Sequence, residues 1–395
     1  MIVQHNITAM NANRMLGLTT GSLAKSTEKL SSGYRINRAA DDAAGLTISE
    51  KMRKQIRGLD QASTNAEDGI SAVQTAEGAL TEVHSMLQRM NELAVQAANG
   101  TMSEDDRQAV QDEVDQLVTE IDRVSTTTKF NETYLLKGDD NKTTITKTVY
   151  TKPDMSLVED AMAKGSTLTV KTAMDATGKT EYTFTSGLAE GSTWAGKKVV
   201  KDSATPGADE IKLADAQKAE LAAMNKVITT YGAEMGINAV TLAAGDNDVT
   251  SKSNQFTYND SLTFSLHVGA DSSSDNKINV TIDSISSDGL SLKGLTVAGK
   301  TSAPATRSID TISDAIKKVS SQRSALGAVQ NRLEHTIANL DNVVENTTSA
   351  ESRIRDTDMA EEMVTYSKNS ILQQAGQSML AQANQANQGV LSLLQ

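Results

Sequence analysis

Few side chains in this sequence could perform chemistry, and they are scattered. The four histidines, His5, His84, His267 and His335, lie in four separate segments, and there is no cysteine. A transition-metal site needs several such ligands at close spacing, as in H-E-x-x-H, and no such pattern occurs. We therefore interpret each histidine as packed or solvated, and we expect no metal site and no cofactor.

Acidic residues cluster at 104–106 (EDD) and at 361–362 (EE). Two neighbouring carboxylates can act as a general acid and base, but acidic residues also stabilise the first turn of a helix, and we favour that interpretation. The sequence contains no G-x-S-x-G, no Walker motif and no G-x-G-x-x-G after a strand. We predict that the protein is not an enzyme.

The composition disfavours two classes of partner. A formal charge of −12 disfavours nucleic acid, which selects a basic face. The last 27 residues carry no charged side chain, but ten of them are Gln or Asn, whose amides lipid could not satisfy, so we expect no membrane span. The first residues lack the basic and apolar regions of a cleaved secretory signal, so any export would use another route.

Apolar stripes at the two ends of the chain are the strongest structural pattern. Near the C-terminus the stripe recurs at steps of three and four, at Leu372, Ala375, Met379, Ala383, Ala386, Val390 and Leu394. Near the N-terminus it recurs every seven residues, at Ile2, Ala9, Leu16, Leu23 and Leu30. Because such a stripe needs an apolar partner, we expect the two terminal helices to meet, inside one subunit or between neighbours. The residues predicted to pack between subunits are Ile2, Leu16, Leu23, Leu30, Leu372, Met379, Val390 and Leu394.

Heptads also span the segments next to the ends. From 43 to about 99 they predict a helix of about 80 Å, which Asn99-Gly100 ends. Ser103 is a candidate N-cap for a second helix, which would fold back on the first as an antiparallel hairpin. A third run covers 306–350, where Arg323 and Gln330 replace apolar residues and therefore need specific partners. Residues 33–42 lack a stripe and would connect two layers.

The centre of the chain has a different texture. Thr, Val and aromatic residues alternate over 143–150, 166–172, 181–185 and 255–267, which predicts strands. Residues 213–231 predict a helix, 271–275 a turn, and 277–285 the return strand of a hairpin. Helical segments at both ends thus enclose a smaller α/β insertion, as in a rod with an outward-facing insertion.

Five stretches of the sequence resemble bacterial flagellins. They are 31–49 (SSGYRINRAADDAAGLTIS), 87–100 (LQRMNELAVQAANG), 320–340 (SSQRSALGAVQNRLEHTIANL), 350–359 (AESRIRDTDM) and 370–395. The similarity covers roughly 1–140 and 305–395, well over half of the chain. Residues 268–270 (VGA) and the strand that follows also resemble a hairpin of flagellins.

The resemblance implies a mainly α fold with a smaller β-rich insertion, in three domains. An inner coiled-coil domain of terminal helices would comprise 1–42 and 351–395. A helical rod domain with a β-hairpin would comprise 43–140 and 262–350, and a variable, outward-facing α/β domain would comprise 141–261.

The resemblance also implies a structural subunit that polymerises into the flagellar filament, a helical homopolymer of eleven protofilaments that is turned as a propeller for motility. Expected partners are other copies of the chain, the flagellar cap, the hook–filament junction protein and an export chaperone. Such a subunit is secreted by type III export and resides outside the cell, in the bacterial flagellum.

Flagellins are further recognised by the flagellin-sensing Toll-like receptor of vertebrate hosts. The positions that match the family's receptor contacts are Arg89, Leu93 and Glu113, with Gln88 beside them. Asn91 stands where strongly activating flagellins frequently have Arg. Leu93 has an alternative role, which is to pack between protofilaments.

Two other functions share some of these features. The hook–filament junction protein has the same terminal patterns, and the full-length flagellin motifs disfavour it. Some flagellins carry a metallopeptidase in the insertion, and the absence of H-E-x-x-H disfavours that activity here.

Overall fold

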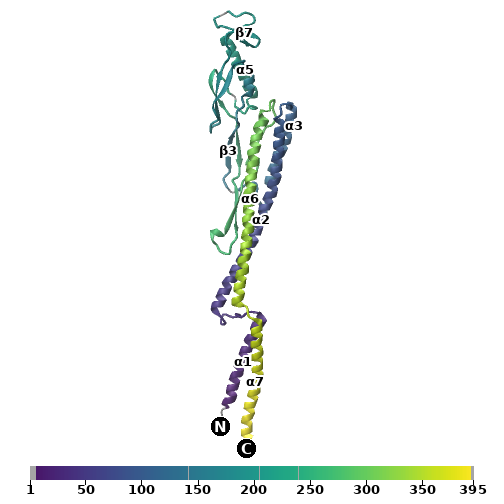
Figure 1. The fold of residues 1–395 in the computed structure, drawn as a ribbon, viewed down its shortest axis with the longest axis vertical. Helices are drawn as coiled ribbons and strands as arrows, with labels where there is room; N and C mark the ends of the chain where they lie inside the picture. Colours follow the sequence, from purple (N-terminus) through teal and green to yellow (C-terminus); the bar gives the residue numbers. More distant parts are fainter. Residues whose placement is uncertain (1–5, 141, 204, 239, 393–395) are drawn as a thin grey trace. The chain divides into compact units, whose positions relative to one another are not determined.

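The computed structural model describes residues 6–140, 142–203, 205–238 and 240–392, with the backbone alone over 386–392 (Figure 1). The chain forms two compact units, a terminal unit of residues 1–68, 266–278 and 333–395 and a central unit of residues 69–265 and 279–332. The long helices are α1 (Ile7–Ser32), α2 (Ala43–Ala97), α3 (Glu104–Thr127), α6 (Ala303–Arg355) and α7 (Met359–Ser392). Within these ranges no helix is both long and apolar enough to cross a membrane.

The local sequence explains where two of these helices begin. Ser103 Oγ accepts a hydrogen bond from the Asp106 amide (3.1 Å), and the Asp106 carboxylate accepts one from the Ser103 amide (3.1 Å), which is a capping box at the start of α3. Pro304 lies in the first turn of α6, where the missing N–H costs no helical bond. The predicted cap at Ser103 is confirmed, and α6 begins before the predicted residue 306 because its first turn accommodates proline.

The predicted antiparallel hairpin of α2 and α3 is confirmed in the central unit. Arg89 on α2 pairs with Glu113 on α3 at 2.9 Å, and Arg107 on α3 donates to the carbonyl of Ala97 at the end of α2. Heptad positions on α2, α3 and α6 supply one apolar core of this unit, and its buried side chains include Val73, Ala76, Leu80, Val83, Leu87, Met90, Ala94, Val110, Val114, Ile121, Ile312, Val319 and Leu326.

Two polar side chains of α3 hold the loop that precedes α6. Arg107 is 4% exposed, and its guanidinium donates to the carbonyls of Ala97 (3.0 Å) and of residues 299 and 300 (both 3.1 Å). Gln111 Oε1 accepts from the Val297 amide (2.6 Å), and its Nε2 donates to the carbonyl of residue 295 (3.0 Å). Buried polar groups of a loop must be paired, and these two residues pair them.

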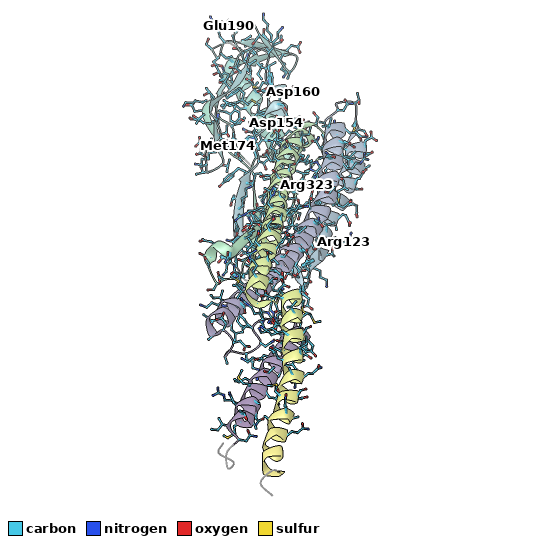
Figure 2. The ribbon with its side chains drawn as sticks, turned by 60° about the horizontal axis from the view of Figure 1, so that its bottom comes forward. Arg123, Asp154, Asp160, Met174, Glu190 and Arg323 are labelled. Carbon is cyan, nitrogen blue, oxygen red and sulfur yellow. The ribbon has the colours of Figure 1, made fainter. Side chains whose placement is uncertain are left out.

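A polar position inside the heptads of α6 has the specific partner that we expected. Arg323 Nη2 lies 3.4 Å from Glu77 Oε1 on α2, and both side chains are about one third exposed (Figure 2). This pair fixes the register of α6 against α2 within the central unit.

The centre of the chain contains short strands and two more helices. The strands are β1 (Lys129–Phe130), β2 (Thr133–Tyr134), β3 (Ile145–Tyr150), β4 (Thr167–Thr172), β5 (Lys179–Thr185), β6 (Thr193–Trp194), β7 (Lys197–Val200), β8 (Glu210–Lys212), β9 (Gly245–Thr250), β10 (Ser253–Tyr258), β11 (Leu262–His267) and β12 (Lys277–Ile282). The helices are α4 (Ser156–Asp160) and α5 (Leu213–Tyr231), and a 3-10 turn, η1, covers Ser274–Asn276.

These strands form small sheets. They pair as β1–β2, β10–β3, β11–β12, β4–β5–β9 and β6–β7–β8, and all pairs with a described register are antiparallel except β7–β8. The predicted strands at 143–150, 166–172 and 181–185 and the helix at 213–231 are confirmed. The single strand predicted over 255–267 was wrong, because the polar residues 259–261 separate β10 from β11.

A second apolar core lies between α5 and the sheet β4–β5–β9. Met224 and Ile228 of α5 pack with Tyr182, Phe184 and Val249 of the sheet. The same helix buries Glu220, whose carboxylate accepts hydrogen bonds from the Ala163 amide (2.9 Å) and the Ser186 hydroxyl (2.7 Å).

In the terminal unit, the end of the β11–β12 hairpin packs on α2 and α6. Leu59, Ala62 and Leu340 are buried there against Ala270. Gly58 permits this approach, because a Cβ at that position would lie 3.0 Å from the Cβ of Ala270. Asn65 Nδ2 donates to the carbonyl of His267 at 3.0 Å.

Candidate assembly surfaces

Helices α1 and α7 lie side by side and run antiparallel in the terminal unit (Figure 1). Asn6 Nδ2 donates to the Ala383 carbonyl (3.1 Å) at one end, and Lys29 Nζ pairs with Glu362 (3.4 Å) at the other. Between them, a Cβ at Gly376 would lie 3.3 Å from Leu16 Cδ1, so the glycine lets the helices approach closely. The prediction that the two termini meet is confirmed within one chain.

The two helices contribute different faces to this contact. The covered face of α1 carries apolar, small and polar residues at steps of three and four, which are Ala9, Ala12, Leu16, Thr19, Leu23, Ser26 and Leu30. The covered face of α7 is more polar and consists of Glu362, Tyr366, Asn369, Gln373, Gly376, Leu380 and Ala383. Apart from Ala383, the described residues of the C-terminal apolar stripe, which are Leu372, Ala375 and Met379, therefore lie outside the face that meets α1.

That stripe is exposed in the single chain. Leu372 is 47% exposed and Met379 is 61% exposed. Successive residues of an α-helix are rotated by about 100° about its axis, so Leu372 and Met379 point roughly 90° away from the face of α7 that meets α1. Of the 16 large apolar side chains exposed among the described residues, four lie on α1 and six on α7, and they are Ile7, Met10, Met15, Leu18, Met359, Met363, Val364, Ile371, Leu372 and Met379.

The eight residues predicted to pack between subunits therefore lie in different environments. Leu16, Leu23 and Leu30 are half-buried towards α7 of their own chain, whereas Leu372 and Met379 are exposed. Ile2, Leu394 and the side chain of Val390 lie outside the described residues. Sequence periodicity located the stripes but could not say which face each helix turns to its partner.

The segment 33–42 is tied to the break between α6 and α7. The Arg35 amide donates to the Arg355 carbonyl (2.6 Å), and the Thr357 amide donates to the Gly33 carbonyl (3.0 Å). Arg355 lies over the ring of Tyr34, 4.8 Å from its centroid, and pairs with Glu50 at 2.8 Å. These contacts join the two connecting segments to each other and to the start of α2.

The residues predicted to contact a receptor lie on the α2–α3 hairpin of the central unit. Gln88 and Arg89 are exposed on α2, and Arg89 pairs with Glu113 (2.9 Å) and Glu92 (3.3 Å). Hydrogen bonding to Glu113, and then the charge of Glu113, raise the pKa of Arg89. Leu93 is only 2% exposed, so it lies beneath this polar cluster rather than in it.

Comparison with known proteins identifies the family. The model for the bacterial flagellin N-terminal helical region matches residues 3–141, and the model for the C-terminal helical region matches residues 309–394. The flagellin of Clostridium tyrobutyricum is 44% identical over 98% of this chain and 100% of its own length. The flagellins of Halalkalibacterium halodurans and Bacillus subtilis are each 40% identical over 100% of both chains.

Among solved structures, the crystal structure of Bacillus cereus flagellin is 18% identical, with a TM-score of 0.34 over 70% of this chain and 88% of that chain. The family assignment rests on the sequence matches, which extend over the full length. The chain therefore belongs to the bacterial flagellin family, whose members are structural proteins of the bacterial flagellum and not enzymes.

Proposed function

We propose that this chain is a filament subunit that polymerises through α1 and α7 into a helical flagellar filament used for motility. The observation that carries the proposal is the row of apolar side chains left exposed on both terminal helices. The chain itself does not bury these side chains. Each of four examples is at least 47% exposed, and these are Met10, Ile371, Leu372 and Met379. Other copies of the chain would cover them.

The energy available from this burial is of the same order as the cost of association. Fully burying a large apolar side chain contributes about 1.5–3 kcal/mol relative to leaving it exposed. Since Leu372 and Met379 are roughly half exposed, each retains about 1 kcal/mol for an intersubunit contact. Ten such side chains would together contribute about 10 kcal/mol. The loss of rotational and translational freedom on association costs about 4–15 kcal/mol, so the two are comparable.

Membership of the family supports the finer features of the proposal. The filament would contain eleven protofilaments around a central channel, and the domains would be 1–42 with 351–395 at its centre, 43–140 with 262–350 around them, and 141–261 outside. The subunit would leave the cell by type III export with a chaperone and assemble under a cap beyond the hook–filament junction protein. The absence of cysteine suits passage between redox compartments.

Charge substitution on α7 tests the assembly surface. Leu372→Asp would place a carboxylate where a neighbouring copy packs, while Gln377→Asp adds the same charge at an exposed polar position on the other flank of the helix. We expect both variants to keep the helical circular-dichroism spectrum of the free chain. Of the two point variants, Leu372→Asp should fail to elongate filament seeds and Gln377→Asp should elongate them. A variant that lacks residues 369–395 should also fail. Seed elongation by Leu372→Asp at the rate of Gln377→Asp would disprove the proposed surface.

We also propose that the flagellin-sensing Toll-like receptor binds the polar cluster on the α2–α3 hairpin. The exposed Gln88, Arg89 and Glu113 would make the contacts, and the buried Leu93 would support them from below. Arg89→Ala and Glu113→Ala should each weaken signalling in receptor-expressing reporter cells. Arg123→Ala, on an exposed part of α3, should leave signalling unchanged (Figure 2). Equal signalling by all three variants would contradict the proposal that the receptor contacts Arg89 and Glu113.

A further inference from the structure

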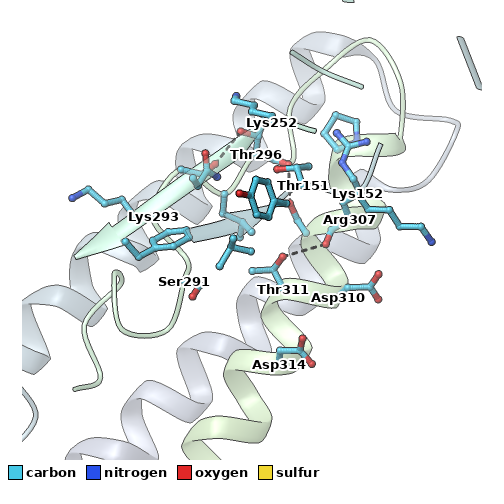
Figure 3. Close-up of a pocket in the computed structure, with 18 of the residues that line it drawn as sticks. Thr151, Lys152, Lys252, Ser291, Lys293, Thr296, Arg307, Asp310, Thr311 and Asp314 are labelled. Carbon is cyan, nitrogen blue, oxygen red and sulfur yellow. Dashed lines mark hydrogen bonds between the residues drawn. The ribbon is translucent and has the colours of Figure 1, made fainter. Parts of the chain in front are cut away.

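A cavity of about 570 Å³ lies inside the central unit (Figure 3). Strands β3 and β10 form one wall, the loop of residues 289–299 a second, and the first turns of α6 a third. This volume falls in the range of ordinary small-molecule sites, roughly 300–1,000 Å³. Neither assembly through α1 and α7 nor receptor binding on the α2–α3 hairpin requires a cavity at this place.

Its lining is cationic although the whole chain is acidic. Six lining side chains are basic and three are acidic. Some residues of both signs already have partners, since Glu234 accepts from Thr301 (2.7 Å), Asp314 pairs with Lys317 (3.0 Å) and Lys293 pairs with Asp288 (3.2 Å). The exposed lysines at 147, 152 and 252 have no ion pair within the described residues.

Several donors in the lining lack an acceptor. Arg307 Nη2 donates to the Glu234 carbonyl, but its buried Nη1 has no hydrogen-bond partner among the described residues, and the Asp154 carboxylate is 3.8 Å away. The buried Oγ of Ser291 also has no partner there, and Ser291 has a φ of +61°, which is uncommon for a residue with a side chain. Unpaired buried donors are costly, and strained residues concentrate at functional sites.

Lys318 adds a half-buried charge with neutral partners. Its ammonium donates to the Gly289 carbonyl (3.0 Å) and lies 5.5 Å from the centroid of the Tyr258 ring. Burial lowers the pKa of Lys318, the charge of Asp283 opposes this, and the charge of Lys147 adds to it. An anion in the cavity would therefore stabilise the charged form of Lys318.

We propose that this cavity binds an acidic saccharide, a sugar that carries carboxylate or other oxyanion groups. Arg307 Nη1 and Ser291 Oγ, which make no hydrogen bond to the described residues, and the ammonium groups of the lysines would bind the oxyanions. The remaining lining suits a hydroxylated ring rather than a bare ion, because it combines threonine hydroxyls, such as that of Thr151, with the rings of Tyr150 and Phe256.

Calorimetric titration of the full, unassembled chain with three probes tests the class of ligand. The probes are trigalacturonate, which is an acidic trisaccharide, maltotriose, which is a neutral one, and inorganic phosphate. We expect trigalacturonate to bind at least tenfold more tightly than either of the others. Equal affinity for trigalacturonate and maltotriose would refute the role of the charges. Equal affinity for trigalacturonate and phosphate would refute the saccharide class, and no binding of trigalacturonate would refute the site.

Variants locate the binding. The double variant Lys147→Ser with Lys252→Ser removes two exposed cavity lysines and should weaken trigalacturonate binding by roughly tenfold or more. The double variant Lys197→Ser with Lys198→Ser removes two exposed lysines of β7 and should change it by less than about twofold. Ser291→Ala leaves the net charge unchanged and should weaken binding several-fold. Equal effects of the two lysine pairs, or no effect of Ser291→Ala, would show that the binding is not in this cavity.

Discussion

Replacing Arg107 by alanine should open the junction between α2, α3 and the loop that precedes α6. The guanidinium is 4% exposed and donates to three backbone carbonyls within 3.1 Å, and its hydrogen bonds to the described part of the chain all end on carbonyls rather than carboxylates. Its removal takes this donor from the buried carbonyl of residue 97 and from the partly buried hydrogen bonds to the carbonyls of residues 299 and 300.

The expected loss of unfolding free energy in Arg107→Ala is the difference between two large effects. A hydrogen bond from a charged donor contributes about 1.5–3 kcal/mol, so three would sum to about 5–9 kcal/mol. Withdrawing the cation from water costs several kcal/mol, which leaves a net loss of about 2–4 kcal/mol on truncation. At a slope of about 3 kcal/mol per molar urea, the midpoint of unfolding of the central unit should fall by about 1 M. Arg107→Lys should lose about half as much, since one ammonium cannot serve all three carbonyls.

Urea unfolding followed by helical circular dichroism, with hydrogen exchange read over residues 97–107 and 295–300, measures this loss. The control is Arg123→Ala, because that arginine is 60% exposed and pairs with Glu120 on its own helix. The control should lose less than about 0.5 kcal/mol. If the two alanine variants unfold at the same urea concentration, the buried guanidinium does not hold the junction.

Three smaller perturbations follow from local contacts. Ser103→Ala removes half of the capping box and should cost about 1 kcal/mol, seen as faster hydrogen exchange in the first turn of α3. Hydrogen bonding with the side chain and then the amide of Ser103 lowers the pKa of Asp106 from its ordinary 3.8. The stabilisation from the Asp106 carboxylate is complete above pH 3.8 and is lost as the pH falls through the lowered pKa. Protection of the first turn of α3 against hydrogen exchange should therefore decline below about pH 4. In Ser103→Ala the decline should occur at a higher pH. Gly376→Leu forces a side chain against Leu16, only 3.3 Å from the Cβ position, and should weaken the α1–α7 pair by about 1–3 kcal/mol, measured as lost helical signal and slower seed elongation.

The helices could be predicted because their information is local. Heptads, the Ser103 cap and the Asn99-Gly100 end all lie within a few residues of the boundaries they set, and α2 and α3 follow them closely. Local alternation predicted β3, β4 and β5, but not every short strand could be predicted in the same way. Strand β9 (GDNDVT) has the composition of a turn, and it is a strand because it pairs with β5, which lies far away in the sequence.

The candidate surfaces show the same limit. Arg107 and Gln111 look like solvated positions of an acidic helix, and only the fold brings the carbonyls of residues 295–300 to them. The stripe through Leu372 was evident in the sequence, but its direction was not. The face around Gly376 meets α1, where the glycine permits close approach, and the apolar side through Leu372 and Met379 stays exposed in the single chain. The cavity has no sequence signature, because its walls come from segments far apart in the chain.

Half of the ten exposed apolar side chains on α1 and α7 are methionines, namely Met10, Met15, Met359, Met363 and Met379. Methionine is unbranched and rotates about three bonds, so it fills gaps of different shape at little cost. Contact surfaces rich in methionine can slide over one another and still pack well, whereas surfaces of leucine or isoleucine would form cavities or steric clashes. A polymer held together by them would bend and recover under load, as a rotating shaft in a viscous fluid must.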